Sequence, residues 1–272
     1  MKIYMSVDME GVAGIVNWDY TSITGTQYDR ARRLMTGEVN AAVKGALRAG
    51  AQEIVVNDSH NSMTNILFED LLPPASLLSG SPKVNSMMEG LDASFAGVVL
   101  IGYHSMMNTR GVLNHSYSSA SVYCLKINGA ETGELGINAY IAGHYNVPVL
   151  MITGDDELVD EAKKLIPGAK AVQVKEARGR YAALNRNYCE VRSLIEDAAA
   201  EAVVARDKIE PVKIQGPVVI EVTLANSGMA DAAQIMPGIE RTGPNILTYE
   251  ANDILTAYRA FRTITGLAAQ VK

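Results

Sequence analysis

The first eleven residues, MKIYMSVDMEG (1–11), contain a short apolar run followed by two acidic residues. Three later stretches also join an apolar run to acidic or histidine side chains: EIVVNDSH (53–60), GVVLIGYH (97–104) and VPVLMITGDD (147–156). Each run has the length of a buried strand, and helical hydrophobic spacing marks 28–49, 134–145 and 156–165. Apolar strands that alternate with amphipathic helices favour a mostly parallel sheet covered on both faces. The predicted fold class is therefore α/β, a mostly parallel sheet flanked by helices.

The last quarter of the chain predicts a second, smaller unit. After a helix predicted at 188–204, the stretch 208–217 carries Pro211 and Pro217 and indicates a boundary. We predict an α/β metal-binding catalytic domain over 1–207 and a smaller α+β domain over 208–272. The segment 111–128 alternates like a hairpin and is expected to pack with the second domain. The smaller domain should contain strands at 218–224 and 246–249 and helices at 229–235 and 252–265.

Composition and charge exclude several classes of partner. The chain has 272 residues and a formal net charge of -6, which argues against nucleic acid or anionic lipid as a ligand. Its longest apolar stretch, 95–101, is far shorter than the roughly 20 residues of a membrane-spanning helix. No export signal is visible, and Cys124 and Cys189 are in no metal-binding or redox spacing. We expect a cytoplasmic protein with no membrane or nucleic-acid partner and no disulfide.

Potential metal ligands follow the predicted strands. Asp8 and Glu10 follow the first strand, His60 the second and His104 the third. The carboxyl ends of parallel strands form the usual ligand-binding edge, and carboxylates and imidazoles are the usual oxygen and nitrogen ligands of Zn²⁺. A single aspartate is more often a helix cap or turn former, and a single histidine a hydrogen-bonded loop residue. The metal hypothesis therefore depends on the co-occurrence of these residues at one edge.

Other acidic and histidine residues have simpler explanations. Asp155 and Asp156 are expected to cap the helix that follows them. Glu134 near a predicted helix start is favoured by the helix dipole, and His144 at the far end of that helix is left out of the site. His115 lies in the predicted hairpin segment and is a candidate base, acid or polar strand residue.

Five motifs closely resemble those of one peptidase family. In order along the chain they are SVDMEG (6–11), VNDSH (56–60), GYHS (102–105), LNHS (113–116) and GELGINAY (133–140). The chain is thus similar to the D-aminopeptidase (DppA) family, peptidase family M55, which is associated with dipeptide transport. The resemblance continues through VPVLMITGDD (147–156) and YEANDILTAYRAF (249–261), nearly the whole chain. It implies a binuclear zinc aminopeptidase that releases N-terminal D-amino acids, D-alanine especially, from short peptides.

The resemblance also implies residue roles and an assembly. Glu134 is preferred over Glu131 because the family motif matches at GELG (133–136). His115 is the implied catalytic residue, while its role as nucleophile or as acid and base stays open. The implied assembly is a homo-oligomer, a ring-shaped decamer with two Zn²⁺ per subunit. The implied zinc ligands are Asp8 as the bridging carboxylate, Glu10, His60, His104 and Glu134.

Two other functions remain as alternatives. The same ligands suit another metal-dependent hydrolase, a phosphoesterase or an amidase, because two-metal sites also serve phosphate esters. The shortage of Lys and Arg near the proposed ligands weighs against a phosphate substrate. The second alternative is a non-catalytic peptide-binding protein, which has no reason to gather five potential metal ligands. Selectivity for D over L residues depends on the resemblance alone.

Overall fold

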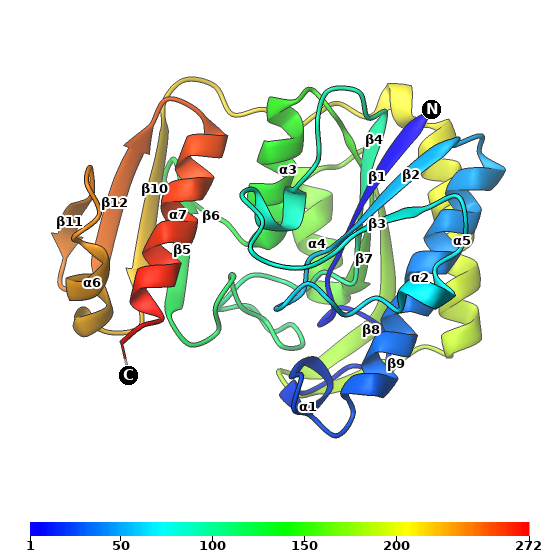
Figure 1. Ribbon diagram of the computed structural model, residues 1–272, viewed down its shortest axis with the longest axis horizontal. Coiled ribbons are helices and arrows are strands. Elements are labelled where there is room, and N and C mark those ends of the chain that lie inside the picture. Colours follow the sequence, from blue (N-terminus) through cyan, green and yellow to red (C-terminus); the bar gives the residue numbers. More distant parts are fainter. Residues whose placement is uncertain (272) are drawn as a thin grey trace.

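The computed structural model, which describes residues 1–271, contains two sheets (Figure 1). The larger sheet has seven strands in the order β3-β2-β1-β4-β7-β8-β9, and all neighbours are parallel except β8 and β9. This confirms the predicted α/β class. The strands are β1 (Lys2–Val7), β2 (Glu53–Asp58), β3 (Ser76–Leu78), β4 (Gly97–Ile101), β7 (Val149–Asp155), β8 (Lys170–Gly179) and β9 (Ala182–Asn185).

Helices cover both faces of this sheet. In Figure 1, α2 (Tyr28–Arg48) and α5 (Tyr188–Val204) lie together on one side, and α3 (Glu134–His144) and α4 (Asp156–Leu165) lie on the other. The close contact of α2 with α5 depends on Gly45, where an added Cβ would lie 2.1 Å from the backbone oxygen of Glu196. The short helix α1 (Trp18–Thr21) follows the first strand, and the 3₁₀ turns are η1 (Phe68–Asp70), η2 (Ser86–Met88) and η3 (Arg206–Lys208).

The second sheet is antiparallel and has the order β11-β12-β10-β5-β6. Its strands are β5 (Val122–Ile127), β6 (Ala130–Glu131), β10 (Val218–Leu224), β11 (Glu240–Gly243) and β12 (Ile246–Ala251). Helix α7 (Ile254–Ala268) packs on β10 and β12, with α6 (Ser227–Ala233) beside it, and α7 also contacts α3. Helix α7 therefore connects the smaller sheet to a helix that covers the larger one.

The hairpin predicted at 111–128 is only partly correct. Residues 111–121 form turns and bends without a strand, and the hairpin is β5 and β6, at 122–131. This hairpin joins the second sheet, because β5 pairs with β10. The turn-forming residues 114–119 (NHSYSS) end the alternation that predicted a strand. The division into domains at residue 207 stays a prediction.

Three strands at the two ends of the larger sheet were not predicted: the three-residue strand β3 at one end, and β8 and β9 at the other. Strand β8 is only partly buried and carries four charged residues among its ten, and β9 is mostly exposed. Such strands lack the continuous apolar runs that identify the central ones. Within residues 1–271, no helix is both long and apolar enough to cross a membrane.

Strand β8 contributes a fully buried lysine that holds the loop after β1. The Nζ atom of Lys175 donates hydrogen bonds to the backbone carbonyls of Glu10 at 2.5 Å, Val12 at 3.0 Å and Ile15 at 2.7 Å. Lys175 is 0% exposed, and burial lowers its pKa to about 8. Three carbonyl acceptors around one ammonium fix the path of the loop that carries the first acidic motif.

A buried glutamate of α2 holds the same loop. The Glu38 carboxylate accepts a hydrogen bond from the backbone N–H of Ala13 at 2.9 Å. Burial raises the pKa of Glu38 to about 7, although Ala13 and the charge of Lys175 oppose this shift. The loop after β1 is therefore fixed by one buried cation and one buried acid.

Replacing Lys175 should destabilise the fold strongly. Lys175→Met leaves three carbonyls without their donor, and we expect a loss of about 3 kcal/mol in the free energy of unfolding. The control is Lys170→Met at the start of the same strand, because Lys170 is exposed and pairs with Glu201 on the surface. Urea denaturation should show a change below about 1 kcal/mol for this control. Equal losses in both variants would contradict the anchoring role of Lys175.

Candidate metal centre and active-site cavity

Six side chains named from the sequence meet at the carboxyl edge of the larger sheet. Strands β1, β2 and β4 end level with one another, because Val7 is paired with Asp58 on one side and Ile101 on the other. The chain therefore leaves the sheet at neighbouring points. The side chains that meet there are Asp8 and Glu10 after β1, His60 after β2, His104 after β4, His115 in the loop before β5, and Glu134 at the start of α3.

The carboxylates and imidazoles are in direct contact. His60 Nδ1 lies 3.2 Å from Asp8 Oδ1 and 3.0 Å from Glu10 Oε2. His104 Nε2 lies 3.5 Å from Asp8 Oδ2 and 3.3 Å from Glu134 Oε1. Asp8 thus contacts both imidazoles with different oxygens, which makes it the central carboxylate of the group. All of these side chains are buried.

Backbone carbonyls determine which nitrogen of each imidazole carries a proton. A carbonyl oxygen only accepts, so the ring nitrogen facing it must be the N–H donor. The other nitrogen of each ring then directs its lone pair towards the carboxylates unless it is protonated. An imidazole held in this way is typical of a metal ligand. The three bonds join His60 Nε2 to Thr21 O at 2.8 Å, His104 Nδ1 to Ser105 O at 3.0 Å, and His115 Nδ1 to Leu113 O at 2.8 Å.

The donor set fits a divalent cation. Nε2 of His104 and Oε2 of Glu10 are buried and have no hydrogen-bond partner. Two groups of ligand atoms lie within 4.8 Å of one another: one from Asp8, Glu10 and His104, and one from His104, His115 and Glu134. A buried ring nitrogen and a buried carboxylate oxygen that make ion-pair contacts but no well-formed hydrogen bond can be satisfied by a metal ion, and the mixed oxygen and nitrogen set suits Zn²⁺.

The pKa shifts show how strongly this site needs positive charge. Burial lowers the pKa of His104, but the charges of Glu134 and Asp8 outweigh it and raise the pKa to about 10. Burial also lowers the pKa of His60, but the neighbouring Glu10 and Asp8 outweigh this effect and raise the pKa well above its ordinary value. Burial and the neighbouring Glu10 raise the pKa of Asp8 to about 7. Without a metal ion, the protonated imidazoles of His60 and His104 supply the positive charge that faces the carboxylates.

His115 differs from the other two histidines. Its ring stacks on that of His104, with centroids 4.0 Å apart and planes inclined by 10°. Burial and the neighbouring His104 lower the pKa of His115, so its imidazole is neutral at neutral pH. Its Nε2 lies 3.7 Å from Glu134 Oε1 at the cavity. A neutral imidazole with a fixed tautomer can accept a proton at this atom.

The remaining acids and His144 lie outside this group. Asp155 caps α4 by accepting from the N–H of Leu158, as predicted, whereas Asp156 is the first residue of α4 and accepts from the N–H of Ala177 instead. Glu131 is exposed on β6, and His144 is exposed at the end of α3. Of the two acids near the start of α3, only Glu134 reaches the cluster.

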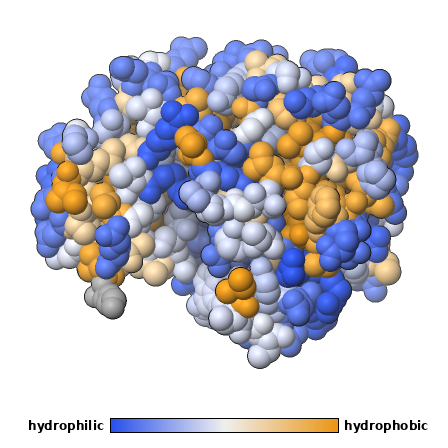
Figure 2. All heavy atoms as spheres, viewed as in Figure 1, coloured by the Kyte–Doolittle hydropathy of each residue, from blue (hydrophilic) through white to orange (hydrophobic). Residues whose placement is uncertain are grey.

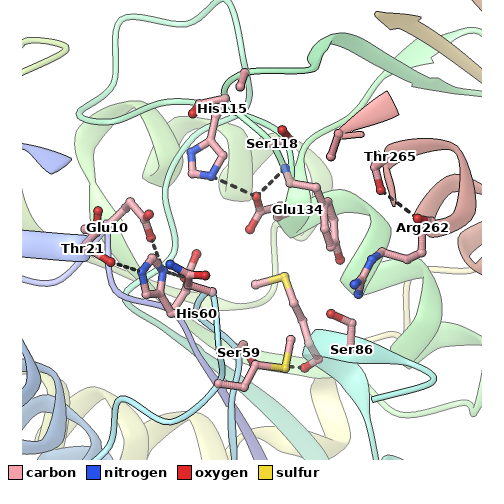
Figure 3. A pocket seen from close by; sticks show the side chains of 18 of the residues that line it. Glu10, Thr21, Ser59, His60, Ser86, His115, Ser118, Glu134, Arg262 and Thr265 are labelled. Atoms are coloured by element: carbon pink, nitrogen blue, oxygen red, sulfur yellow. Dashed lines mark hydrogen bonds and ion pairs between the residues drawn. The ribbon is translucent and has the colours of Figure 1, made fainter. Parts of the chain in front are cut away.

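The cluster opens into a cavity of about 490 Å³. Figure 3 shows Glu10 and His60 at one side, His115 and Glu134 above, and Arg262 extending from α7 at the opposite side. The wall formed by Arg262, Thr265 and Gly266 was not foreseen from the sequence. No local motif marks it, because α7 reaches the cavity only through its packing on α3 and the second sheet.

Comparisons with known proteins agree with one another. A profile of the D-aminopeptidase family, peptidase family M55, matches residues 1–263. A D-aminopeptidase from Bacillus subtilis (strain 168) is 40% identical over 269 residues, which are 98% of each chain. The solved structure of the Zn-dependent D-aminopeptidase DppA from Bacillus subtilis, described as a self-compartmentalizing protease, superposes with a TM-score of 0.97. That match has 40% identity and covers 100% of this chain and 99% of the other. The chain belongs to the D-aminopeptidase family, peptidase family M55.

Proposed function

We propose that the protein is a binuclear zinc aminopeptidase that releases N-terminal D-amino acids, D-alanine in preference, from short peptides. The observation that carries this proposal is the convergence of three buried carboxylates with the ring nitrogens of His60 and His104 that face them. The zinc dependence and D-aminopeptidase activity named for the Bacillus subtilis relatives support it. The cavity beside the cluster has a volume suited to a small substrate.

Five residues would hold two zinc ions. Asp8 suits the bridging position because its two oxygens face different imidazoles, those of His60 and His104. Zinc, when bound, supplies Lewis acidity that polarises a peptide carbonyl and lowers the pKa of water. The complete proposed ligand set is Asp8, Glu10, His60, His104 and Glu134.

We assign His115 a proton-transfer role. Its Nδ1–H is fixed on the Leu113 carbonyl, so Nε2 is the atom that exchanges a proton at the cavity. A neutral imidazole there can take up a proton and deliver it to the leaving amine. The protonated ring can also stabilise the negative charge of the tetrahedral intermediate. Glu134, 3.7 Å away, favours the protonated form once it has formed.

We also propose a homo-oligomer, a ring-shaped decamer, located in the cytoplasm. The self-compartmentalizing description of the Bacillus subtilis structure supports an assembly. Phe68 and Val84 are large apolar side chains exposed to solvent. Figure 2 shows apolar residues gathered at the right of the face that it views. Such exposure is typical of surfaces that contact other chains. The free thiols of Cys124 and Cys189 are consistent with a reducing compartment.

The zinc-loaded protein should release D-alanine from D-Ala-D-Ala. Chelation should abolish this activity, and added Zn²⁺ should restore it, because the proposed ligands hold the metal that activates the reaction. Chromatographic measurement of free alanine should show much slower hydrolysis of L-Ala-L-Ala under the same conditions. Hydrolysis of an aryl phosphate without peptidase activity would favour the phosphoesterase alternative. Tight peptide binding without any hydrolysis would favour a binding protein.

Replacing His115 should separate catalysis from metal binding. His115→Ala should retain the zinc content of the unaltered protein and lower kcat by about 10²- to 10⁴-fold, the usual contribution of a proton-transfer group. The matched control is His144→Ala, because His144 is exposed at the end of α3. Metal analysis and steady-state kinetics should find this control unchanged. Unaltered turnover in His115→Ala would remove His115 from the reaction.

A further inference from the structure

Arg262 faces the cavity without a partner for its guanidinium. Its Nη1 atom is buried and makes no hydrogen bond, and no carboxylate of residues 1–271 lies within ion-pair distance of this side chain. The guanidinium carbon lies 5.9 Å from the centroid of the Tyr117 ring. A buried N–H donor without an acceptor is unfavourable unless a ligand supplies one.

Another arginine of the same helix shows the contrast. Arg259, less than one turn earlier in α7, is exposed and donates through Nε and Nη2 to Asn85 Oδ1 at 3.3 and 3.1 Å. It does not line the cavity, whereas Arg262 does. The helix therefore carries one arginine with a protein partner and one that faces the cavity without a partner.

The negative and positive side chains that line the cavity lie at different sides of it. Asp8, Glu10 and Glu134 lie in the metal cluster, and among the described residues that line the cavity Arg262 is the only lysine or arginine. Figure 3 shows Arg262 pointing into the cavity from the side opposite Glu10 and His60. A short peptide with free termini has a complementary arrangement, a positive amino end and a negative carboxyl end.

We propose that Arg262 binds the C-terminal carboxylate of the substrate. This inference rests on the proposed function and narrows it to short peptides with a free C-terminus. A guanidinium matches a carboxylate with two parallel N–H···O bonds, which a lysine ammonium does not reproduce. The cavity volume of about 490 Å³ suits a short peptide held between Arg262 and the metal cluster.

Tyr117 links the two ends of this arrangement. Its backbone N–H donates to Glu134 Oε1 at 2.7 Å, while its ring lies beside the Arg262 guanidinium. The ring hydroxyl donates to the hydroxyl of Tyr258 at 3.0 Å, which ties it to α7. Tyr117 therefore lies between Arg262 and the proposed metal ligand Glu134, so the proposed carboxylate site is next to the residues that would position the reacting bond.

The test compares D-Ala-D-Ala with its C-terminal amide, because the amide removes only the carboxylate charge. In Arg262→Gln we expect kcat/KM for the free acid to fall about 10- to 100-fold and that for the amide to change less than about 3-fold. Arg262→Lys, which keeps the charge, should recover part of the loss. Arg259→Gln is the control and should leave kcat/KM unchanged for both substrates. If Arg262 had a purely structural role, Arg262→Gln would instead lower kcat/KM equally for both substrates.

The outcomes distinguish this inference from the function on which it rests. If the unaltered protein hydrolyses both substrates and Arg262→Gln keeps the original ratio of their kcat/KM values, the assignment of Arg262 is overturned and the aminopeptidase proposal stands. If the unaltered zinc-loaded protein hydrolyses neither substrate, both fall together. A selective loss on the free acid, with unchanged zinc content, supports both.

Discussion

The site is governed by the negative charge that the fold buries at one sheet edge. Asp8, Glu10 and Glu134 are all withdrawn from water, and burying ionised carboxylates is costly unless positive charge accompanies them. The high pKa values of His60 and His104 show this requirement, because protons on these rings supply positive charge beside the carboxylates. A divalent cation bound by the same side chains would supply that positive charge instead. The metal affinity that we propose for this edge is thus a consequence of how the strands end.

The rest of the fold keeps these groups from moving apart. The equal ends of β1, β2 and β4 bring their loops together, and Lys175 fixes the loop after β1 through three carbonyls. Backbone carbonyls hold His60 and His104 in one tautomer each, so both present a nitrogen to the carboxylates. A site built this way is preorganised, because its proposed ligands are oriented before a metal or a substrate arrives.

The central strands and the proposed ligands were predictable because the signals are local. Apolar runs mark β1, β2, β4 and β7, and the polar residues directly after a parallel strand must lie at the sheet edge. Glu134 was included among the proposed ligands because of the family resemblance, since its position at a helix start is equally explained by the helix dipole. The edge strands β8 and β9 lack continuous apolar runs, and they were missed for that reason.

Features that depend on contacts between residues far apart in the sequence could not be predicted in this way. Lys175 lies among charged and apolar residues that resemble any surface strand, and only the folded chain shows its three carbonyl partners 160 to 165 residues away. Arg262 is one of two arginines in α7 with similar local sequence surroundings, and helix packing alone directs it into the cavity. The predicted strand within 111–121 failed because turn chemistry outweighed alternation there.

Anomalous diffraction at the zinc absorption edge, from crystals of the protein purified without chelator, tests the central claim most directly. The account predicts two anomalous peaks per chain, both among Asp8, Glu10, His60, His104 and Glu134, with Asp8 in contact with each. A single peak would contradict the binuclear centre. Peaks elsewhere, or none after soaking with Zn²⁺, would contradict the metal site itself.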